Sequence, residues 1–306
     1  MADPARAALT ILLSTFDGER HLDELLRSVR AQSFGDWILV CRDDGSSDGT
    51  RAVLERHAAD DERIRIVDDG RGRLGPAGSF FALLADVDTE MFAFCDQDDV
   101  WERHKLAWSI DELRRATAPI AAVYTDAWIA DETATVVRAS ALADRGVRHP
   151  PGFGELLLVN AAIGATMVGT GDLARAVTAM DRPATMHDWW TALVAAYAGD
   201  LRLLPVPTLR WRRHGDTATG GAGGSGSIGR ARRNDYLAWS IAAAQRLADG
   251  PLTPGDRNTS RAVAAMGAMG ERGINLRDSL RADRAGARAW PLRRRLAVHA
   301  GSLLAR

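Results

Sequence analysis

Three carboxylates lie within four residues of a segment, residues 92–101, that reads FAFCDQDDVW. Asp96, Asp98 and Asp99 directly follow an apolar run that is typical of a buried strand. Carboxylates this close raise one another's pKa and oppose folding unless a cation or solvent offsets their charge. Carboxylate oxygens are ligands that Mg²⁺ and Mn²⁺ prefer. The segment therefore fits either a divalent-metal site that binds phosphate groups or an acidic turn without a ligand.

A second acidic strand end lies upstream. Residues 37–41 form a continuous apolar run, as expected for a parallel strand covered on both faces, and Asp43 and Asp44 follow it. Open α/β sheets bind ligands beyond the carboxyl ends of their strands, so neighbouring strands would bring both acidic ends to one crevice. There, one carboxylate can accept hydrogen bonds from a base or ribose, and a pair can hold Mg²⁺ or Mn²⁺ against a diphosphate. Neither a P-loop nor a G-x-G-x-x-G motif follows the first expected strand.

The order of the elements predicts how these strand ends are positioned. Apolar runs at residues 9–13, 37–41 and 64–67 predict strands, and the residues between them predict helices over residues 19–31 and about 48–57. This β-α-β-α-β order predicts a parallel sheet with right-handed crossovers. Further along, we expect helices through residues 80–84, 101–113, 156–159, 173–180 and 187–197, strands at residues 121–125 and 162–168, and edge strands at residues 201–204 and 208–211 separated by Pro205 and Pro207.

The chain divides into three parts by composition. We expect an α/β domain over residues 1–218. Residues 219–229 are rich in Gly and Ser, which predicts a flexible loop that serves as a linker or a lid. Residues 230–306 are rich in Ala and Arg and predict a helical extension. Its basic end could contact an anionic membrane surface, although a solvated helix face is the simpler interpretation.

The composition also excludes some classes of protein. The 306 residues are 46% hydrophobic and 26% charged, as in ordinary globular proteins, and the net charge of −1 argues against a general nucleic-acid binder. Cys41 and Cys95 lie in apolar runs without metal-ligand spacing, so we expect buried free thiols and a reducing, cytoplasmic location. No run approaches the ~20 apolar residues of a membrane-spanning helix, so we expect a soluble protein, at most peripheral at the inner face of a membrane.

The chain resembles family 2 glycosyltransferases of the GT-A fold over about residues 8–220. The resemblance rests on an ordered set of motifs: STFDG at residues 14–18, DDGSSDGT at 43–50, DQDDVW at 96–101, YTD at 124–126, HDWW at 187–190 and RRHG at 212–215. The DQDDVW form with HDWW downstream is most similar to the rhamnosyltransferase-type branch. The chain departs from the family at Ser79, where relatives often carry an asparagine. The implied fold is a Rossmann-like α/β arrangement, with a mostly parallel central sheet flanked by helices.

The resemblance implies a role for each motif. Thr15 and Asp43 would lie against the nucleobase of a sugar nucleotide. Asp96 and Asp98 would form the D-x-D pair, which contacts the ribose and a divalent metal, Mg²⁺ or Mn²⁺. Asp188 would be the catalytic base. The other implied contacts are Asp17, Asp44, Gln97 and Arg213 for the nucleotide sugar, His214 with Asp98 for the metal, and Asp99, Trp101, Asp126, Trp189 and Trp190 for an acceptor pocket.

The implied activity moves one sugar from a nucleotide-diphosphate donor to a hydroxyl of a glycan, a lipid-linked sugar or a small molecule. The resemblance suggests dTDP-L-rhamnose as the donor, with a UDP-hexose next. Displacement at an anomeric carbon needs a Lewis acid for the leaving diphosphate and a base for the attacking hydroxyl. Because no covalent intermediate is needed, we expect the anomeric configuration to invert. Arg210 and Trp211 lack the glutamine of the Gln-x-x-Arg-Trp motif of processive synthases, so we expect no polymerisation.

Two other functions remain open. A nucleotidyltransferase can share a similar sheet and paired acids, but it would usually carry a basic, glycine-rich loop where this chain reads STFDGE. A non-catalytic sugar-nucleotide-binding protein would be favoured by the loss of Asp98 or Asp188, and both are present. Single residues also have simpler interpretations: Asp188 could cap its helix, Trp189 and Trp190 could pack in the core, and His214 could lie on the surface.

Overall fold

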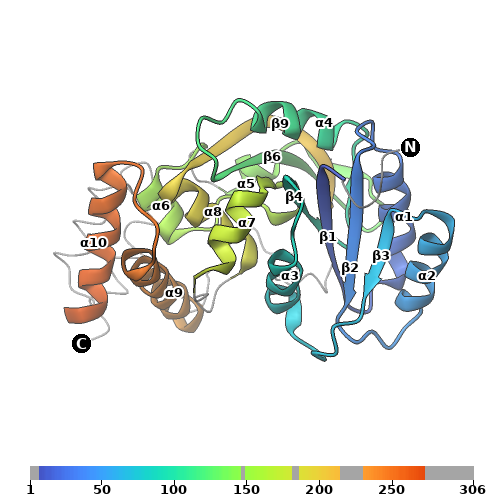
Figure 1. Cartoon of the computed structure of the whole chain (residues 1–306), viewed down its shortest axis with the longest axis horizontal. Coiled ribbons are helices and arrows are strands. Elements are labelled where there is room, and N and C mark those ends of the chain that lie inside the picture. Colours follow the sequence, from blue (N-terminus) through green and yellow to red (C-terminus); the bar gives the residue numbers. More distant parts are fainter. Residues whose placement is uncertain (1–6, 146–148, 181–185, 214–229, 273–306) are drawn as a thin grey trace.

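A nine-stranded mixed sheet runs through the molecule (Figure 1). The computed structural model describes residues 7–145, 149–180, 186–213 and 230–272. The strand order is β3 (Ile64–Val67), β2 (Trp37–Asp43), β1 (Leu9–Thr15), β4 (Met91–Asp96), β8 (Val168–Thr170), β6 (Ala121–Ala130), β9 (Asp200–Arg212) and β5 (Val100–Trp101), with β7 (Val136–Arg138) paired to β6.

The first four strands form the parallel half of the sheet, as the sequence predicted. β1 pairs in parallel with β2 and β4, and β2 pairs in parallel with β3. The register places Ser14 opposite Asp96 and Thr15 opposite Asp43, so the two acidic strand ends lie at one edge. The apolar side chains of β1 and β4 are buried because helices cover both faces of this half.

The helices of the parallel half follow the expected crossovers. They are α1 (Glu19–Arg30), α2 (Thr50–Asp60) and α3 (Gly75–Ala85). α1 and α2 pack on each other, while α3 packs with α7 (Gly171–Thr178) and α8 (His187–Ala198) (Figure 1). On α1 the buried residues recur at helical spacing, at Leu22, Leu25, Leu26 and Val29.

In the second half of the sheet, the directions of the strands and the identity of the edge strand differ from the prediction. β8 is antiparallel to both β4 and β6, and β9 is parallel to β6. The two edge strands predicted around Pro205 and Pro207 are wrong: they form one strand, β9, which lies between β6 and β5. The register shifts from Thr125 opposite Leu204 to Asp126 opposite Pro207. Prolines are tolerated at such a bulge because the regular ladder, which needs their missing N–H, is interrupted there.

Two smaller expectations also change. Trp101, expected to begin a helix, pairs with β9 together with Val100 as strand β5, and helix α4 (Lys105–Leu113) begins later. The strand expected at residues 162–168 is a 3₁₀ turn at Gly164–Thr166 followed by β8. Short helices α5 (Ala141–Arg145) and α6 (Phe153–Leu158) complete this region.

The expected C-terminal helices begin as α9 (Arg230–Asp249) and α10 (Arg257–Arg272). They lie side by side, and both pack on α6 (Figure 1). Ala243, Ala244 and Leu247 of α9 are buried, and the Gly255 N–H donates to the Tyr197 carbonyl at 2.7 Å. The Gly- and Ser-rich loop at residues 219–229 and the basic end of the chain lie outside the described residues. Of the helices described, none combines the length and apolar character needed to cross a bilayer.

Gly199 is a position where a methyl group should be costly. It ends α8 at the start of β9, and a Cβ there would come within 1.7 Å of the Ile120 carbonyl oxygen. That carbonyl accepts the Asp200 N–H at 3.0 Å, so β6 and β9 would have to separate. We expect Gly199→Ala to lower the free energy of unfolding by about 1–3 kcal/mol. Gly35→Ala is the control, because among the described residues no atom lies within 4 Å of its Cβ position. Equal losses of thermal stability in the two variants would contradict this packing.

Candidate active site

The loops that follow β1 and β2 are joined at the sheet edge. Thr15 Oγ1 donates to Asp43 Oδ1 at 2.9 Å, and Ser46 N donates to Asp43 Oδ2 at 3.1 Å. Asp17 Oδ1 accepts the Ser47 N–H at 2.7 Å. The structure thus brings Thr15 and Asp43, the two expected nucleobase contacts, into direct contact, with Asp17 beside them.

Gln97 connects this edge to the end of β4. Its amide makes two hydrogen bonds with the Phe16 backbone, accepting from N at 2.8 Å and donating to O at 2.9 Å. Gly18 must be small here, since a Cβ would lie 2.4 Å from Gln97 Oε1. Gln97 therefore fixes the loop after β1 beside Asp96 and Asp98.

Three partly exposed carboxylates converge near the end of β4. Burial raises the pKa of Asp96 to about 8, and the charges of Asp98 and Asp188 act in the same direction. Asp188 is therefore close to Asp96 although it lies on α8, about ninety residues later. Its Oδ2 accepts the Gly164 N–H at 3.1 Å, and its Oδ1 accepts the Trp189 N–H at 2.7 Å. Met186, not Asp188, occupies the N-cap position of α8.

This donor set fits a divalent cation. Asp96 and Asp98 offer hard oxygen ligands, and a cation would offset the charges of Asp98 and Asp188, which add to the effect of burial on the pKa of Asp96. Within the described ranges, no three His, Cys, Asp or Glu side chains are already gathered as a metal-ligand group. His214, the other expected ligand, lies outside these ranges. The neighbouring Arg213 donates its N–H to the Ala130 carbonyl at 3.0 Å, and its guanidinium stacks on Trp211 at 5.3 Å from the ring centroid.

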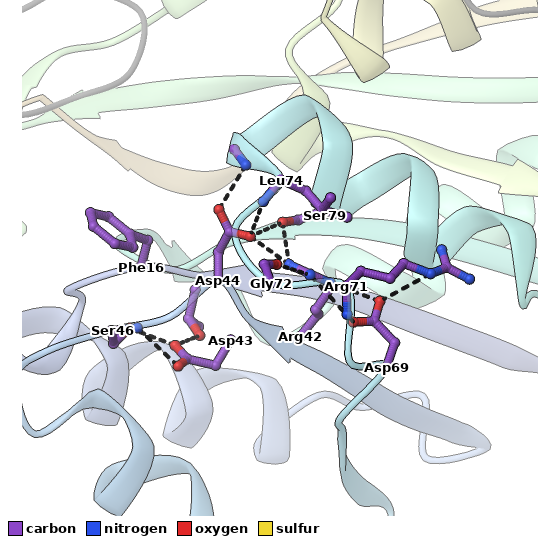
Figure 2. Close-up of polar contacts among 12 residues, drawn as sticks. Phe16, Arg42, Asp43, Asp44, Ser46, Asp69, Arg71, Gly72, Leu74 and Ser79 are labelled. Atoms are coloured by element: carbon purple, nitrogen blue, oxygen red, sulfur yellow. Dashed lines mark hydrogen bonds and ion pairs between the residues drawn. The ribbon is translucent and has the colours of Figure 1, made fainter.

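Asp44 does not face the same space as Asp43. It is 3% exposed, and it accepts the backbone N–H groups of Leu74 and Gly75, both at 2.7 Å (Figure 2). Burial alone would raise its pKa, but these bonds and those from Arg42 and Ser79 outweigh burial and lower it. Sequence reasoning missed Arg42, whose signal was a lone arginine between an apolar strand and an acidic pair.

The residues expected to line an acceptor pocket lie in the interior. Asp99 is fully buried and accepts the Arg212 N–H at 3.1 Å, and burial raises its pKa. Asp126 accepts the N–H groups of Ala141 and Leu142 at the start of α5, at 3.1 and 3.0 Å. The three tryptophans of this set are at most 3% exposed: Trp101, Trp189 and Trp190. Their part in an acceptor pocket stays a prediction.

His187 is held between aromatic rings behind the carboxylates. Its ring stacks on Phe80 at 3.9 Å between centroids and meets the edge of Phe94 at 4.7 Å. Within the part of the chain described, neither ring nitrogen has a hydrogen-bond partner. Burial lowers the pKa of His187 to about 4, although the charge of Asp188 opposes this shift. The imidazole is therefore neutral at pH 7 and serves packing.

The neutral state of His187 predicts a pH dependence of stability. Between pH 6.5 and 4 the unfolded chain takes up a proton that the folded site resists, so the contribution of His187 to stability falls as the pH falls and is constant above about 7. The loss attributable to this residue is at most about 3 kcal/mol at pH 4. We expect His187→Leu to reduce the slope between pH 6.5 and 4 in urea unfolding series. Parallel curves for the variant and the wild type would contradict this assignment.

Comparison with known sequences finds matches to the N-terminal part of the chain, which contains the first four motifs. Residues 10–146 match the family model described as glycosyl transferase family 2. An uncharacterized glycosyltransferase of Nostoc sp. is 36% identical over 101 residues, which cover 32% of this chain and 30% of that protein. The dTDP-rhamnosyl transferase RfbG of Shigella flexneri is 32% identical over 103 residues, which cover 32% of this chain and 36% of that protein. The matched segments thus span about a third of the length of these relatives.

Comparison with solved structures extends over nearly the whole chain. TarS residues 1–349 of S. aureus superpose with a TM-score of 0.60 at 13% identity, over 96% of this chain and 87% of that one. The mannosyltransferase PcManGT of Pyrobaculum calidifontis, in complex with GDP-Man and Mn²⁺, gives a TM-score of 0.55 at 19% identity, over 100% of this chain and 82% of that one. At these identities the likeness establishes the fold. Residues 10–146 therefore match the model of glycosyl transferase family 2, and the chain has the GT-A fold that its sequence predicted.

Proposed function

We propose that this protein is a metal-dependent glycosyltransferase that moves one sugar from a nucleotide-diphosphate donor to an acceptor hydroxyl, with inversion at the anomeric carbon. The observation that carries the proposal is the meeting of three carboxylates, Asp96, Asp98 and Asp188, beside the Thr15–Asp43 pair. A nucleotide at Thr15 and Asp43 would direct its diphosphate towards Asp96 and Asp98. The transferred sugar would then lie within reach of Asp188.

In this proposal Asp96 and Asp98 hold Mg²⁺ or Mn²⁺, together with His214. The bound ion supplies Lewis-acid stabilisation of the leaving diphosphate. The solved mannosyltransferase of the same fold, which is in complex with GDP-Man and Mn²⁺, supports this assignment. Arg213 would add positive charge on the diphosphate side.

Asp188 is the proposed base. Its carboxylate is oriented by the Gly164 and Trp189 N–H groups, at 3.1 and 2.7 Å. Gly164 allows this approach, because a Cβ there would lie 3.0 Å from Asp188 Cβ. A carboxylate fixed in this way can remove the acceptor proton as the hydroxyl attacks, and no covalent sugar–enzyme intermediate is required.

The donor and acceptor are proposed from chemistry and likeness together. The Shigella relative is a dTDP-rhamnosyl transferase, and TarS was solved in complex with UDP-GlcNAc, so dTDP-L-rhamnose and UDP-hexoses are the first donors to test. We place the acceptor among glycans, lipid-linked sugars and small molecules, with cell-surface polysaccharide as the first choice. The two buried free thiols, Cys41 and Cys95, support a cytoplasmic location.

The reaction type is tested by following phosphorus in the product. The full chain is incubated with dTDP-L-rhamnose or UDP-glucose, Mn²⁺ and candidate acceptors, and ³¹P NMR records the products. Release of dTDP or UDP, dependent on the chain and on Mn²⁺, is the expected result. A parallel incubation holds a nucleoside triphosphate and a sugar phosphate in place of the donor. Release of pyrophosphate there, with no diphosphate release in the first incubation, would instead assign a nucleotidyltransferase.

A further inference from the structure

Arg42 is a buried charge at the end of an apolar strand. It lies at the end of β2, is 3% exposed, and directs its guanidinium away from Asp43 (Figure 2). Its Nε and NH2 groups donate to the two oxygens of Asp69, at 3.0 and 3.3 Å. NH1 donates to Ser79 Oγ at 2.9 Å and to Asp44, and NH2 also donates to the Gly72 carbonyl. One side chain therefore ties β2 to the loop of residues 68–75 and to α3.

Asp44 completes the same network from the other side. Its carboxylate accepts from Leu74 N, Gly75 N, Ser79 Oγ and Arg42, so both oxygens are occupied (Figure 2). Gly75 is the first residue of α3, where free N–H groups and the helix dipole favour a negative charge. Asp44 thus holds the end of the loop, and at 3% exposed its carboxylate offers little surface to a nucleotide.

The loop of residues 68–75 depends on such external contacts. Gly70, Gly72 and Gly75 have φ values of +65°, +65° and +72°, and no atom of the residues that the structure describes lies within 4 Å of their Cβ positions. The loop places the Arg73 guanidinium over the Phe16 ring, 3.9 Å from its centroid. Phe16 lies between Thr15 and Asp17 and is bonded through its backbone to Gln97. The loop therefore covers the part of the site where we place the donor.

We propose that Arg42 is a positioning residue: it holds residues 68–75 over Phe16, so that this loop forms one wall of the nucleotide-sugar site. The proposal deepens the function proposed above and rests on it. Removing Arg42 leaves the buried Asp44 without its cation and leaves Asp69 only the half-exposed Arg71, 3.6 Å away, and the loss of a buried cation is strongly destabilising for the segment concerned. If the loop then covers Phe16 only about a tenth of the time, the apparent Kd of a donor rises about tenfold.

The test joins a structural measurement to a binding measurement. Amide hydrogen exchange of residues 70–78 is compared in the wild type, Arg42→Met and Arg42→Lys, and the Kd of UDP or dTDP with Mn²⁺ is measured by calorimetry. We expect faster exchange at Leu74 and Gly75, a Kd raised about tenfold in Arg42→Met, and partial rescue by Arg42→Lys. KM for the donor should rise far more than kcat falls, because the reacting carboxylates are untouched.

Arg202→Met is the matched control. Arg202 also bonds two carboxylates, Glu112 and Asp200, but lies at the start of β9. If Arg42→Met does not fold, Asp69→Asn is the second variant. It weakens the contact of Arg42 with its more exposed partner, whose side chain is 21% exposed, and should change the exchange rates and the Kd in the same direction by smaller amounts. Unchanged exchange in residues 70–78, or faster exchange with unchanged Kd, would overturn the proposal. If the wild type binds neither nucleotide, the proposed function fails, while the exchange data still decide whether Arg42 holds the loop.

Discussion

Replacing Asp188 by asparagine should lower sugar transfer by about 10²–10⁴-fold, because the amide cannot accept the proton of the attacking hydroxyl. The affinity for the nucleoside diphosphate should stay within about twofold, since Asp188 is assigned to the acceptor proton and not to the nucleotide. Asparagine keeps the shape of the side chain and an oxygen that can accept one of the two N–H bonds, from Gly164 or Trp189. The loss should therefore appear in kcat.

Asp172→Asn is the matched control for this variant. Asp172 is also the second residue of a helix, but its side chain is 51% exposed and pairs with Arg175 at 2.7 Å on α7. We expect Asp172→Asn to keep the turnover of the wild type. If Asp188→Asn kept full turnover, Asp188 could not be the base. If it instead lost nucleotide affinity and stability together, its role would be structural, through the contact with Gly164.

Replacing Asp98 by asparagine should remove the metal-dependent part of both binding and turnover. The Lewis-acid contribution of a bound ion amounts to several kcal/mol, so we expect turnover to fall by about 10²-fold or more. The wild type in excess chelator should behave in the same way and recover when Mn²⁺ is added back. Binding of UDP or dTDP to the variant should no longer depend on Mn²⁺, which calorimetry with and without the ion measures directly.

A surface aspartate provides the control for this second variant. Asp60, at the end of α2, is 64% exposed, and Asp60→Asn should keep the wild-type dependence on Mn²⁺. Unchanged turnover of the wild type in excess chelator would remove the metal from the mechanism. Metal-dependent binding that survives in Asp98→Asn would move the ion to other ligands, such as Asp96 with His214.

The parallel half of the sheet and its acidic edge could be predicted because they depend on local patterns. A buried strand followed by carboxylates indicates both the element and its functional end. Neighbouring parallel strands were expected to bring both acidic ends to one crevice, and in the structure Ser14 lies opposite Asp96 and Thr15 opposite Asp43. The helix that carries Asp188 was also predictable, from an apolar run that follows a proline.

Features set by contacts between distant segments could not be read from local patterns. Asp44 looks equivalent to Asp43 in sequence, but the fold turns it towards Leu74 and Gly75, thirty residues away. The two prolines of β9 indicated a break, yet a register shift at Pro207 lets one strand continue. Asp126 ends a predicted strand, but α5 forms over it and takes its oxygens.

The central claim is that the acidic edge binds a nucleoside diphosphate through a divalent cation. A thermal-shift panel of UDP, dTDP, GDP, ATP and NAD, each with and without Mn²⁺, tests it most directly. A ligand at a hundredfold excess over its Kd stabilises the native state by about 2.7 kcal/mol, which is a measurable rise in Tm. We predict stabilisation by UDP or dTDP that requires Mn²⁺ and is absent with ATP and NAD. Stabilisation by no nucleoside diphosphate, with or without the ion, would contradict the account.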